Sequence, residues 1–327
     1  MNGLKQACLP WLAIGIICLF TSGIAPNWGF WAHKRINRLA VYRLPVDMQI
    51  FYKKHIDYLT ENAVNPDRRR YAVVGEAERH FIDLDSYPDS IRYALPVYWQ
   101  EAKVKFQEDS LRKHGMNPWY VQMAAHQLTE AFKTKNTKAI LKLSADLGHY
   151  IADAHVPLHT TKNYNGQLTK QEGIHGFWES RLPELFAEDY DLWIGEVEYI
   201  HNIGQTAWNT IYDSHRAKDS VLLFEQEVSK SFDDDKKYSY ELRNNVLTRT
   251  YSKEFSERYH RLLKGQVERR MRMSVKIVGD MWYTCWINAG QPVLDGDLIH
   301  LNSDELKSEE ASEQRNWLQK LLHIRVE

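Results

Sequence analysis

The chain has 327 residues, of which 43% are hydrophobic and 26% are charged, as in an ordinary folded globular protein. Its formal net charge is −1, so no global field would draw it to nucleic acid, and a polyanionic ligand would have to be held by local charge or by metal. This length suffices for one large domain or two small ones.

The first residues of the chain resemble an export signal. Lys5 supplies a positive charge ahead of an apolar run over residues 9–20, which is shorter than the roughly 20 apolar residues of a membrane span. Small and turn-forming residues follow this run. We therefore expect a signal peptide over residues 1–27 and an exported mature chain, periplasmic or secreted, that begins at Trp28. An uncleaved N-terminal anchor is the alternative.

Cysteine usage limits how the mature chain is stabilised. Two of the three cysteines, Cys8 and Cys18, lie in the expected signal, so the mature chain keeps only Cys285 and forms no internal disulfide. Cys285 has aromatic neighbours in the sequence, which favours a buried, inert thiol over a nucleophile. Stability is therefore expected to come from the core and from metal.

Most of the mature chain is predicted to be helical. Apolar residues recur every three to four positions over residues 36–44, 45–59, 119–133, 137–154, 197–212, 221–232 and 251–287. Turn-forming or charged residues predict loops over 62–70, 83–90, 114–118, 160–173 and 233–237. Alternating patterns typical of strands are scarce, and there is no Gly-rich phosphate loop. The sequence therefore predicts one mainly α domain over residues 28–327, with a C-terminal tail from about residue 292.

The strongest chemical signal lies at the end of the helix predicted over residues 137–154. His149 and Asp153 are four apart and share a helix face, and His159 follows just beyond a proline that ends or redirects the helix. Zinc favours nitrogen and oxygen donors of this kind. His155 is six residues from His149 and points away from that face, so we set it aside as a ligand.

Two further segments offer donors of the same type. His175 and Glu179 are again four apart, and two such pairs on either side of one loop form a stronger signal than either pair alone. Upstream, His80 and Asp83 lie in a segment whose spacing suits a strand or an irregular region. Asp67 precedes this segment. These residues extend the predicted metal site beyond a single helix.

Taken in order, these motifs resemble those of the S1/P1 nuclease and bacterial zinc phospholipase C superfamily. The shared pattern is an N-terminal Trp with a His shortly after, an Asp, then His-Phe-x-Asp, His-x3-Asp-x5-His and His-x3-Glu. It covers residues 28–179, about half of the chain. The resemblance implies an all-α, multi-helix domain of the phospholipase C/P1 nuclease type, with a zinc cluster in a cleft.

The same resemblance implies three zinc ions. The ligands of the first ion would be Asp67, His80, His149 and Asp153, and those of the second would be His159, His175 and Glu179. The third ion would be held by the α-amino group and carbonyl of Trp28 together with His33, and Asp153 would bridge the first and third ions. This third site is conditional on cleavage before Trp28, since an α-amine can ligate only when it is free and deprotonated.

Metal chemistry would then replace a Ser or Cys nucleophile. Bound zinc lowers the pKa of a shared water and stabilises the charge of a phosphoryl transition state. We expect Asp153 and Asp83 to be the catalytic carboxylates, with Asp83 beside the attacking water or, alternatively, orienting a ligand histidine. Arg70 is expected to bind a phosphate, and Phe81 to contact a base or line a lipid site. A solvated cation and ordinary packing are the alternatives for these last two residues.

The predicted function is zinc-dependent hydrolysis of phosphodiester bonds. The spacing of five from Trp28 to His33 favours a nuclease acting on single-stranded nucleic acid or nucleotides, whereas Glu179 and Asp85 favour a phospholipase acting on phospholipid head groups. No protein partner is implied. The alternative is an exported zinc-binding protein with a structural, non-catalytic cluster. A zinc protease is disfavoured, because the chain has no His-Glu-x-x-His motif.

Overall fold

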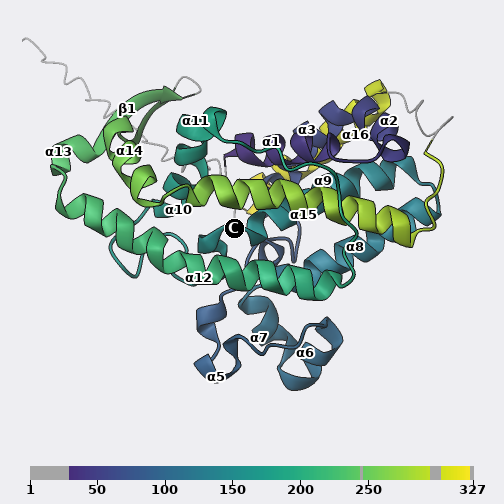
Figure 1. Ribbon diagram of the computed structural model, residues 1–327, viewed down its shortest axis with the longest axis horizontal. Coiled ribbons are helices and arrows are strands. Elements are labelled where there is room, and N and C mark those ends of the chain that lie inside the picture. The colour runs from purple at the N-terminus through teal and green to yellow at the C-terminus, as the bar shows by residue number, and fades with distance from the viewer. Residues whose placement is uncertain (1–28, 244–245, 295–302, 325–327) are drawn as a thin grey trace, which may run out of the picture.

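Helices dominate the computed structural model, which describes residues 29–243, 246–294 and 303–324 (Figure 1). The described chain forms one compact, mainly helical domain, as its apolar spacing predicts. The expected signal peptide over residues 1–27 and the expected ligand Trp28 lie outside the described residues. Within the described residues, no helix is both long and apolar enough to cross a membrane.

The elements follow one another along the chain with short connections. The longer helices are α1 (Phe30–Val41), α2 (Val46–Lys54), α8 (Asn117–Lys133), α9 (Thr137–Ala154), α12 (Ile203–Lys230), α14 (Lys253–Leu262), α15 (Gln266–Asn288) and α16 (Ser303–Ile324). The shorter α-helices are α3 (Ile56–Asn62), α4 (Asn65–Arg69), α5 (Asp89–Arg92), α6 (Trp99–Lys105), α7 (Glu108–Lys113), α10 (Ile174–Gly176), α11 (Leu182–Phe186) and α13 (Asp234–Lys237). The 3₁₀ turns are η1 (Ala77–Arg79), η2 (Leu84–Ser86), η3 (Pro157–Thr160) and η5 (Ala187–Asp189), and η4 (Phe177–Arg181) is a π-helical turn. The two strands are β1 (Tyr238–Arg243) and β2 (Val246–Tyr251).

Helix α9 is the central element of the domain. Most of its side chains are buried, and it packs against α1, α3, α8 and α15. The side chain of Asn136 caps its start by accepting the backbone N–H of Ala139 at 3.1 Å, which satisfies one of the free donors of the first turn. The last turns of α9 carry His149 and Asp153. The partial negative charge of a helix C-terminus favours a cation beside these residues.

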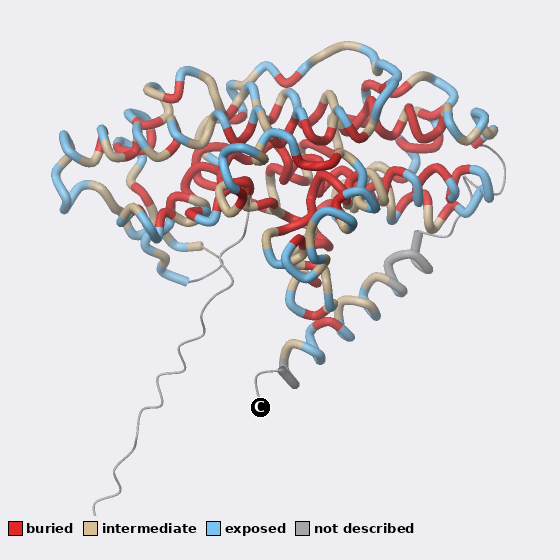
Figure 2. The backbone as a smooth tube through the Cα atoms, turned by 90° about the horizontal axis from the view of Figure 1, so that it is seen from below, coloured by how far each residue is buried: buried red, intermediate tan, exposed pale blue. Residues whose placement is uncertain are grey.

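Two hydrophobic cores hold the helices together. The larger core follows α9 through the middle of the molecule, where Figure 2 shows the buried backbone concentrated, and it includes the fully buried Trp178 and Trp282. The smaller core lies under the lobe formed by α5, α6 and α7, which projects from the long helices in Figure 1. In this second core Trp119 and Trp208 meet edge to face, with ring centroids 5.0 Å apart. The lobe is thereby fixed to α8 and α12.

Some predicted boundaries differ from those of the structure. The helices predicted over residues 197–212 and 221–232 are one continuous helix, α12. The helix predicted over residues 251–287 is two helices, because Lys264 and Gly265 adopt left-handed backbone angles, with φ of 49° and 72°, between α14 and α15. A left-handed pair cannot continue a right-handed helix, so the chain turns there.

The structure contains a β-hairpin that the sequence prediction lacks. Strands β1 and β2 pair antiparallel, with Tyr238 opposite Tyr251 at the base. Arg181 of η4 donates to the Glu241 carboxylate of β1 at 2.9 Å. The hairpin is therefore joined to the π-helical turn that carries Glu179, one of the predicted ligands.

Candidate metal centre

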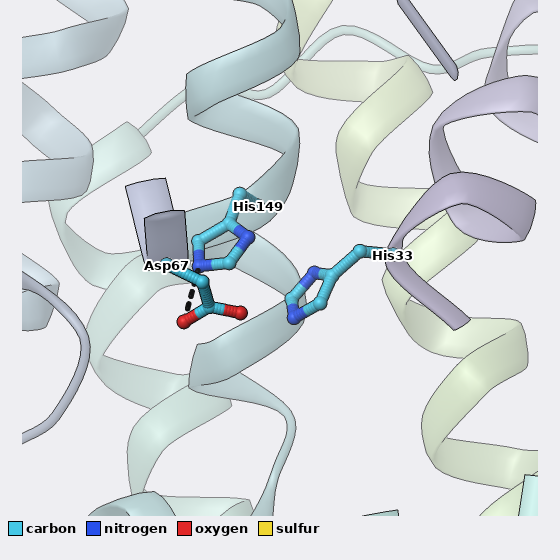
Figure 3. A group of neighbouring side chains, drawn as sticks. All are labelled: His33, Asp67 and His149. Carbon is cyan, nitrogen blue, oxygen red and sulfur yellow. Dashed lines mark ion pairs between the residues drawn. The ribbon is translucent and has the colours of Figure 1, made fainter. Parts of the chain in front are cut away.

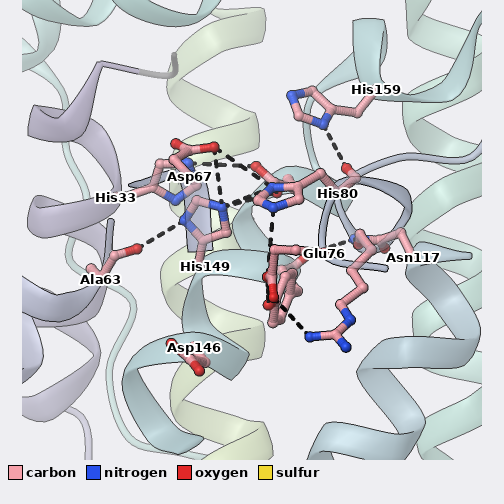
Figure 4. A network of polar contacts seen from close by, with 12 residues as sticks. His33, Ala63, Asp67, Glu76, His80, Asn117, Asp146, His149 and His159 are labelled. Carbon is pink, nitrogen blue, oxygen red and sulfur yellow. Dashed lines mark hydrogen bonds and ion pairs between the residues drawn. The ribbon is translucent and has the colours of Figure 1, made fainter. Parts of the chain in front are cut away.

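Buried nitrogen and oxygen donors converge beside the C-terminal end of α9 (Figure 4). His149 Nε2 lies 3.2 Å from Asp153 Oδ2 and 3.1 Å from His80 Nδ1, and His80 Nδ1 lies 2.9 Å from the same Asp153 oxygen. Asp67 Oδ1 lies 3.7 Å from both of these histidine nitrogens. Around a tetrahedral ion with bonds of about 2.0–2.1 Å, ligand atoms stand about 3.3 Å apart. The four predicted ligands of the first site therefore lie together at separations of the right size.

His33 of α1 faces the same donors from another side (Figure 3). Its ring stacks on that of His149, with centroids 4.0 Å apart and an interplanar angle of 19°, and its Nε2 lies 3.5 Å from Asp153 Oδ1. Asp153 thus turns Oδ2 toward His80 and His149 and Oδ1 toward His33, which is the arrangement a bridging carboxylate needs. Ligand-type atoms of His33, Asp67 and His149 also lie within 4.8 Å of one another.

A second group of donors forms around Glu179. His175 Nε2 lies 2.8 Å and His159 Nε2 lies 3.3 Å from Glu179 Oε2. Glu179 is fully buried in η4, and π-helical turns are frequent at functional sites. Burial by itself would raise the pKa of Glu179, but His175 and His159 lower it to about 2, so the carboxylate is ionised. All three predicted ligands of the second site are therefore brought together.

Backbone carbonyls orient three of these histidines. A carbonyl only accepts, so a ring nitrogen bonded to it must carry the proton, and the other ring nitrogen then keeps a lone pair for a metal. The Nδ1–H groups that donate in this way are those of His149 to the Ala63 oxygen at 2.8 Å, His159 to the His80 oxygen at 2.6 Å and His175 to the Tyr164 oxygen at 3.1 Å. Each therefore presents Nε2 to its carboxylate. His80 is the exception, because it presents Nδ1.

Two carboxylate oxygens test whether the donors fit a cation. Asp67 Oδ2 and Glu179 Oε1 are buried and have no hydrogen-bond partner among the described residues. A buried acceptor left in this way costs about 1–3 kcal/mol, and more when it is charged, unless a cation meets it. The orphaned oxygens and the mixed nitrogen and oxygen donors fit a bound metal ion. Donor type alone does not distinguish zinc from other divalent transition metals.

Charge couples the two groups of donors. Burial would raise the pKa of Asp153, but His149 and His159 hold it well below its usual range. Burial opposes charge on His149 as well, yet Asp153 and Asp67 raise its pKa to about 9. His159 therefore links the two groups, since it lowers the pKa of Asp153 in the first and faces Glu179 in the second. The two groups form one electrostatic unit with an ionised carboxylate in each.

Asp83 lies beside the second group on the segment that follows His80. Its backbone N–H donates to the His114 carbonyl at 2.7 Å, which fixes the backbone of this irregular segment as the sequence predicts. Burial and the nearby Asp85 raise the pKa of Asp83 to about 7, although His159 is near enough to oppose the shift. A carboxyl group with a pKa near neutrality suits the acceptance of a proton.

Asp85 anchors the chain that leaves the second group. Its Oδ2 accepts the Thr161 hydroxyl at 2.6 Å, and its Oδ1 accepts the Lys162 backbone N–H at 3.0 Å. Because these two residues lie two and three positions after His159, Asp85 holds the start of the loop that follows it. Its observed contacts are those of a loop anchor.

Arg70 and Phe81, the expected substrate-binding residues, lie beside ligands in the sequence but are not among the converging donors. Arg70 follows α4, and within the part of the chain that the structure describes it forms no ion pair with a carboxylate. Phe81 is half-buried, and its ring packs so closely on Gly115 that an added Cβ there would lie 2.7 Å from it. Packing against this turn is therefore one role that Phe81 fills.

His155 does not belong to either group. It is buried, and its Nδ1–H donates to the Ile151 carbonyl one turn earlier in α9 at 2.8 Å. Burial lowers its pKa to about 3, so the ring is neutral.

Sequence reasoning missed another residue, Glu76, which is fully buried one turn before His80. The spacing of four between an acid and a histidine was the available signal.

Comparison with known proteins adds no relative. No protein-family model matches the chain, and no curated protein matches it either.

Proposed function

We propose that this chain is a zinc-dependent hydrolase of phosphodiester bonds, of the S1/P1 nuclease and zinc phospholipase C type. The observation that carries the proposal is the position of Asp153. One of its oxygens faces His80 and His149, the other faces His33, and its charge is coupled to His159 in the second group. A carboxylate shared in this way is suited to hold two cations close together.

The proposed ligands are the residues that the structure brings together, plus one outside its described range. They are Asp67, His80, His149 and Asp153 for the first zinc, His159, His175 and Glu179 for the second, and His33 with Trp28 for a third. When bound, the zinc ions supply a water of lowered pKa and offset the charge of a phosphoryl transition state.

The residues around the ions handle the proton and the substrate. Asp83 accepts or orients the proton of the attacking water, which its pKa of about 7 allows near neutral pH. Arg70 holds a phosphate oxygen. The Nε of Arg70, which is buried and has no hydrogen-bond partner among the described residues, supports this role. A purely structural cluster would need neither the Asp83 carboxylate nor the Arg70 guanidinium.

Exposed aromatic rings support single-stranded nucleic acid as the substrate. Tyr164 is 54% exposed, and its ring lies 6.0 Å from that of His175. Tyr93 is 50% exposed beside His215, which bonds to the Thr160 carbonyl next to His159. Aromatic side chains stack on bases whatever the base sequence. Two such rings near the second group would hold unstacked nucleotides.

Phospholipid is the second candidate because of the hairpin. Tyr240, Leu242 and Leu247 lie on one face of the two strands and are each more than 60% exposed. An apolar surface of this kind suits contact with a bilayer interface.

The test is an assay of the purified mature chain on two substrates. A single-stranded oligonucleotide and phosphatidylcholine vesicles are each incubated with zinc-loaded protein, with chelated protein and with chelated protein to which zinc is restored. We expect hydrolysis of one substrate, loss on chelation and recovery with zinc but not with magnesium. If zinc binds and neither substrate is cleaved, the enzymatic proposal fails and a structural cluster takes its place.

A further inference from the structure

A second polar layer lies directly beneath the first group of donors (Figure 4). Figure 4 labels two of its members, Glu76 and Asp146. Arg69 joins them and donates to both oxygens of Glu76, at 2.9 and 3.2 Å. The same guanidinium donates to both oxygens of Asp146, at 3.1 and 2.9 Å. It also donates to the Tyr150 hydroxyl at 2.8 Å, and that hydroxyl donates in turn to Glu76. One arginine thus ties together two buried side chains, those of Glu76 and Tyr150, and the partly buried Asp146.

This layer joins the same three segments that supply the ligands above it. Helix α4 contributes Arg69 to the layer and Asp67 to the donors, and the segment around η1 contributes Glu76 and His80. Helix α9 contributes Asp146 and Tyr150 to the layer and His149 and Asp153 to the donors. Fixing the layer therefore fixes the relative positions of the ligands, because neighbouring residues on a short rigid segment move together. Outer contacts of this kind commonly orient metal ligands.

Glu76 is the member of the layer that faces a ligand. It is fully buried, and the guanidinium of Arg79 also donates to it, at 2.8 Å. A buried carboxylate with two guanidinium partners is ionised. Its Oε1 lies 3.8 Å from His80 Nε2, the ring nitrogen on the side opposite the donors. The charge of Glu76 therefore acts on the far side of that ring.

His80 differs from the other ligand histidines in a way that this contact explains. His149, His159 and His175 donate Nδ1–H to carbonyls and present Nε2, whereas His80 presents Nδ1 to Asp153. With a metal on Nδ1, the proton of the neutral His80 ring is on Nε2, beside Glu76. We propose that Glu76 is a positioning residue that holds His80 in the Nε2–H tautomer with Nδ1 toward the metal, and that Arg69 holds Glu76 in place. This inference rests on the proposed metal centre.

The first test needs no variant. The mature chain, labelled with ¹⁵N in its imidazole rings, is loaded with Zn²⁺ alone, and NMR identifies the nitrogen that each histidine uses. We expect His80 to bind through Nδ1, with a slowly exchanging Nε2–H, and the other three to bind through Nε2. Zinc bound to His80 through Nε2 would overturn the proposal.

The second test compares two isosteric variants by competition with a chelator for Zn²⁺. Glu76→Gln keeps the shape of the side chain but removes its charge, so we expect zinc affinity to fall about 10- to 100-fold and the His80 Nε2–H signal to shift and exchange faster. Asp280→Asn is the control, since Asp280 is equally buried and pairs with Arg43 at 3.0 Å outside the donor groups. It should keep both zinc affinity and the His80 signal.

The outcomes separate this inference from the function on which it rests. Wild-type affinity and an unchanged His80 signal in Glu76→Gln would overturn the role of Glu76 while leaving the metal centre intact. A wild-type chain that binds no zinc would refute the metal centre itself. If Glu76→Gln does not fold, the binding nitrogen of His80 in the wild-type protein decides the question.

Discussion

At the scale of single residues, Asp153 carries more of the centre than any other side chain. It is buried and ionised, and its two oxygens face different histidines. His155, only two positions later in the same helix, faces a backbone carbonyl instead. Substitutions of Asp153 and His155 therefore separate the effect of losing a proposed ligand from the effect of changing a buried polar residue at the end of α9.

Asp153→Asn is predicted to lose bound metal and to abolish hydrolysis. The amide has nearly the same shape but no charge, so the histidines around it no longer share an anionic partner with the cations. Metal content and activity are measured on the folded variant. His155→Asn is the control, because its amide can still donate to the Ile151 carbonyl, and it should keep both. Full zinc content in Asp153→Asn would contradict the assignment.

His215 gives a prediction for stability against pH. Burial and Lys218 lower its pKa from 6.5 to about 4, and its Nδ1–H donates to the Thr160 carbonyl at 3.0 Å. The unfolded chain therefore binds the extra proton first. The contribution of His215 to the free energy of unfolding is complete above pH 6.5 and is lost as the pH falls through 6.5 toward 4. We expect a loss on the order of 2 kcal/mol from this group in denaturant titrations.

A substitution of His215 tests this slope, which is the change in the free energy of unfolding with pH. His215→Asn keeps a donor near the Thr160 carbonyl and cannot titrate, so its stability should fall less between pH 6.5 and 4 than that of the wild type. His201→Asn, at an exposed position, should leave the slope unchanged. Equal slopes in wild type and His215→Asn would exclude His215 as the source.

At the scale of elements, α9 positions its ligands through close packing with α1. Gly148 lies next to His149, and a Cβ added there would lie 2.0 Å from the side-chain oxygen of Asn37. Asn37 is buried and donates to the Ala145 carbonyl at 3.1 Å, so it cannot move freely. The two helices can approach this closely only because position 148 has no side chain.

Gly148→Ala is predicted to destabilise the protein by about 1–3 kcal/mol, the usual cost of forcing an extra methyl group into a packed core. Gly176→Ala is the matched control. No atom lies within 4 Å of a Cβ added at Gly176, and its backbone is helical, so alanine should be neutral or stabilising by up to about 1 kcal/mol. Denaturant unfolding measures both variants. A similar effect from the two substitutions would contradict the packing argument.

The elements also show what the sequence can and cannot predict. The bounds predicted for helix α9, residues 137–154, are those of the structure, because its apolar spacing is regular. The break at Gly265 was missed, since apolar spacing continues across it. The hairpin was missed although Tyr238 to Leu242 alternates, because short alternating runs are weak signals beside strong helical ones.

The sequence predicts those parts of the candidate site whose residues are close together in the chain. His149 and Asp153, like His175 and Glu179, are one helical turn apart, so their spacing reveals a shared face. The polar layer around Arg69 depends on contacts between α4 and α9, which no local pattern encodes. Arg69 is one of three consecutive arginines in the sequence, and only its contacts in the folded chain distinguish it from Arg70.

At the scale of the whole molecule, the metal centre joins segments that are far apart in the chain. Its proposed ligands come from α1, α4, the segment after η1, α9, η3 and the α10–η4 turn. The donors bring several ionised groups into the interior, and without cations part of their charge is unopposed. Bound metal should therefore stabilise the entire domain.

Removal of metal is predicted to lower the melting temperature by about 5–10 °C for each ion that is lost. A ligand at 100 times its dissociation constant stabilises by about 2.7 kcal/mol per site, and each kcal/mol shifts the melting temperature by about 2–4 °C in a domain of this size. Differential scanning with and without a chelator measures the shift. Asp153→Asn should show no such difference. A wild-type melting temperature that chelation leaves unchanged would argue against a stabilising metal.

The central claim is that these buried histidines and carboxylates hold zinc. Elemental analysis of the purified, exported chain tests it most directly, as moles of each metal per mole of protein. We predict zinc as the dominant metal at two ions per chain, or three if the mature chain begins at Trp28. A zinc content well below one ion per chain after saturation and dialysis, or a different metal in its place, would contradict it.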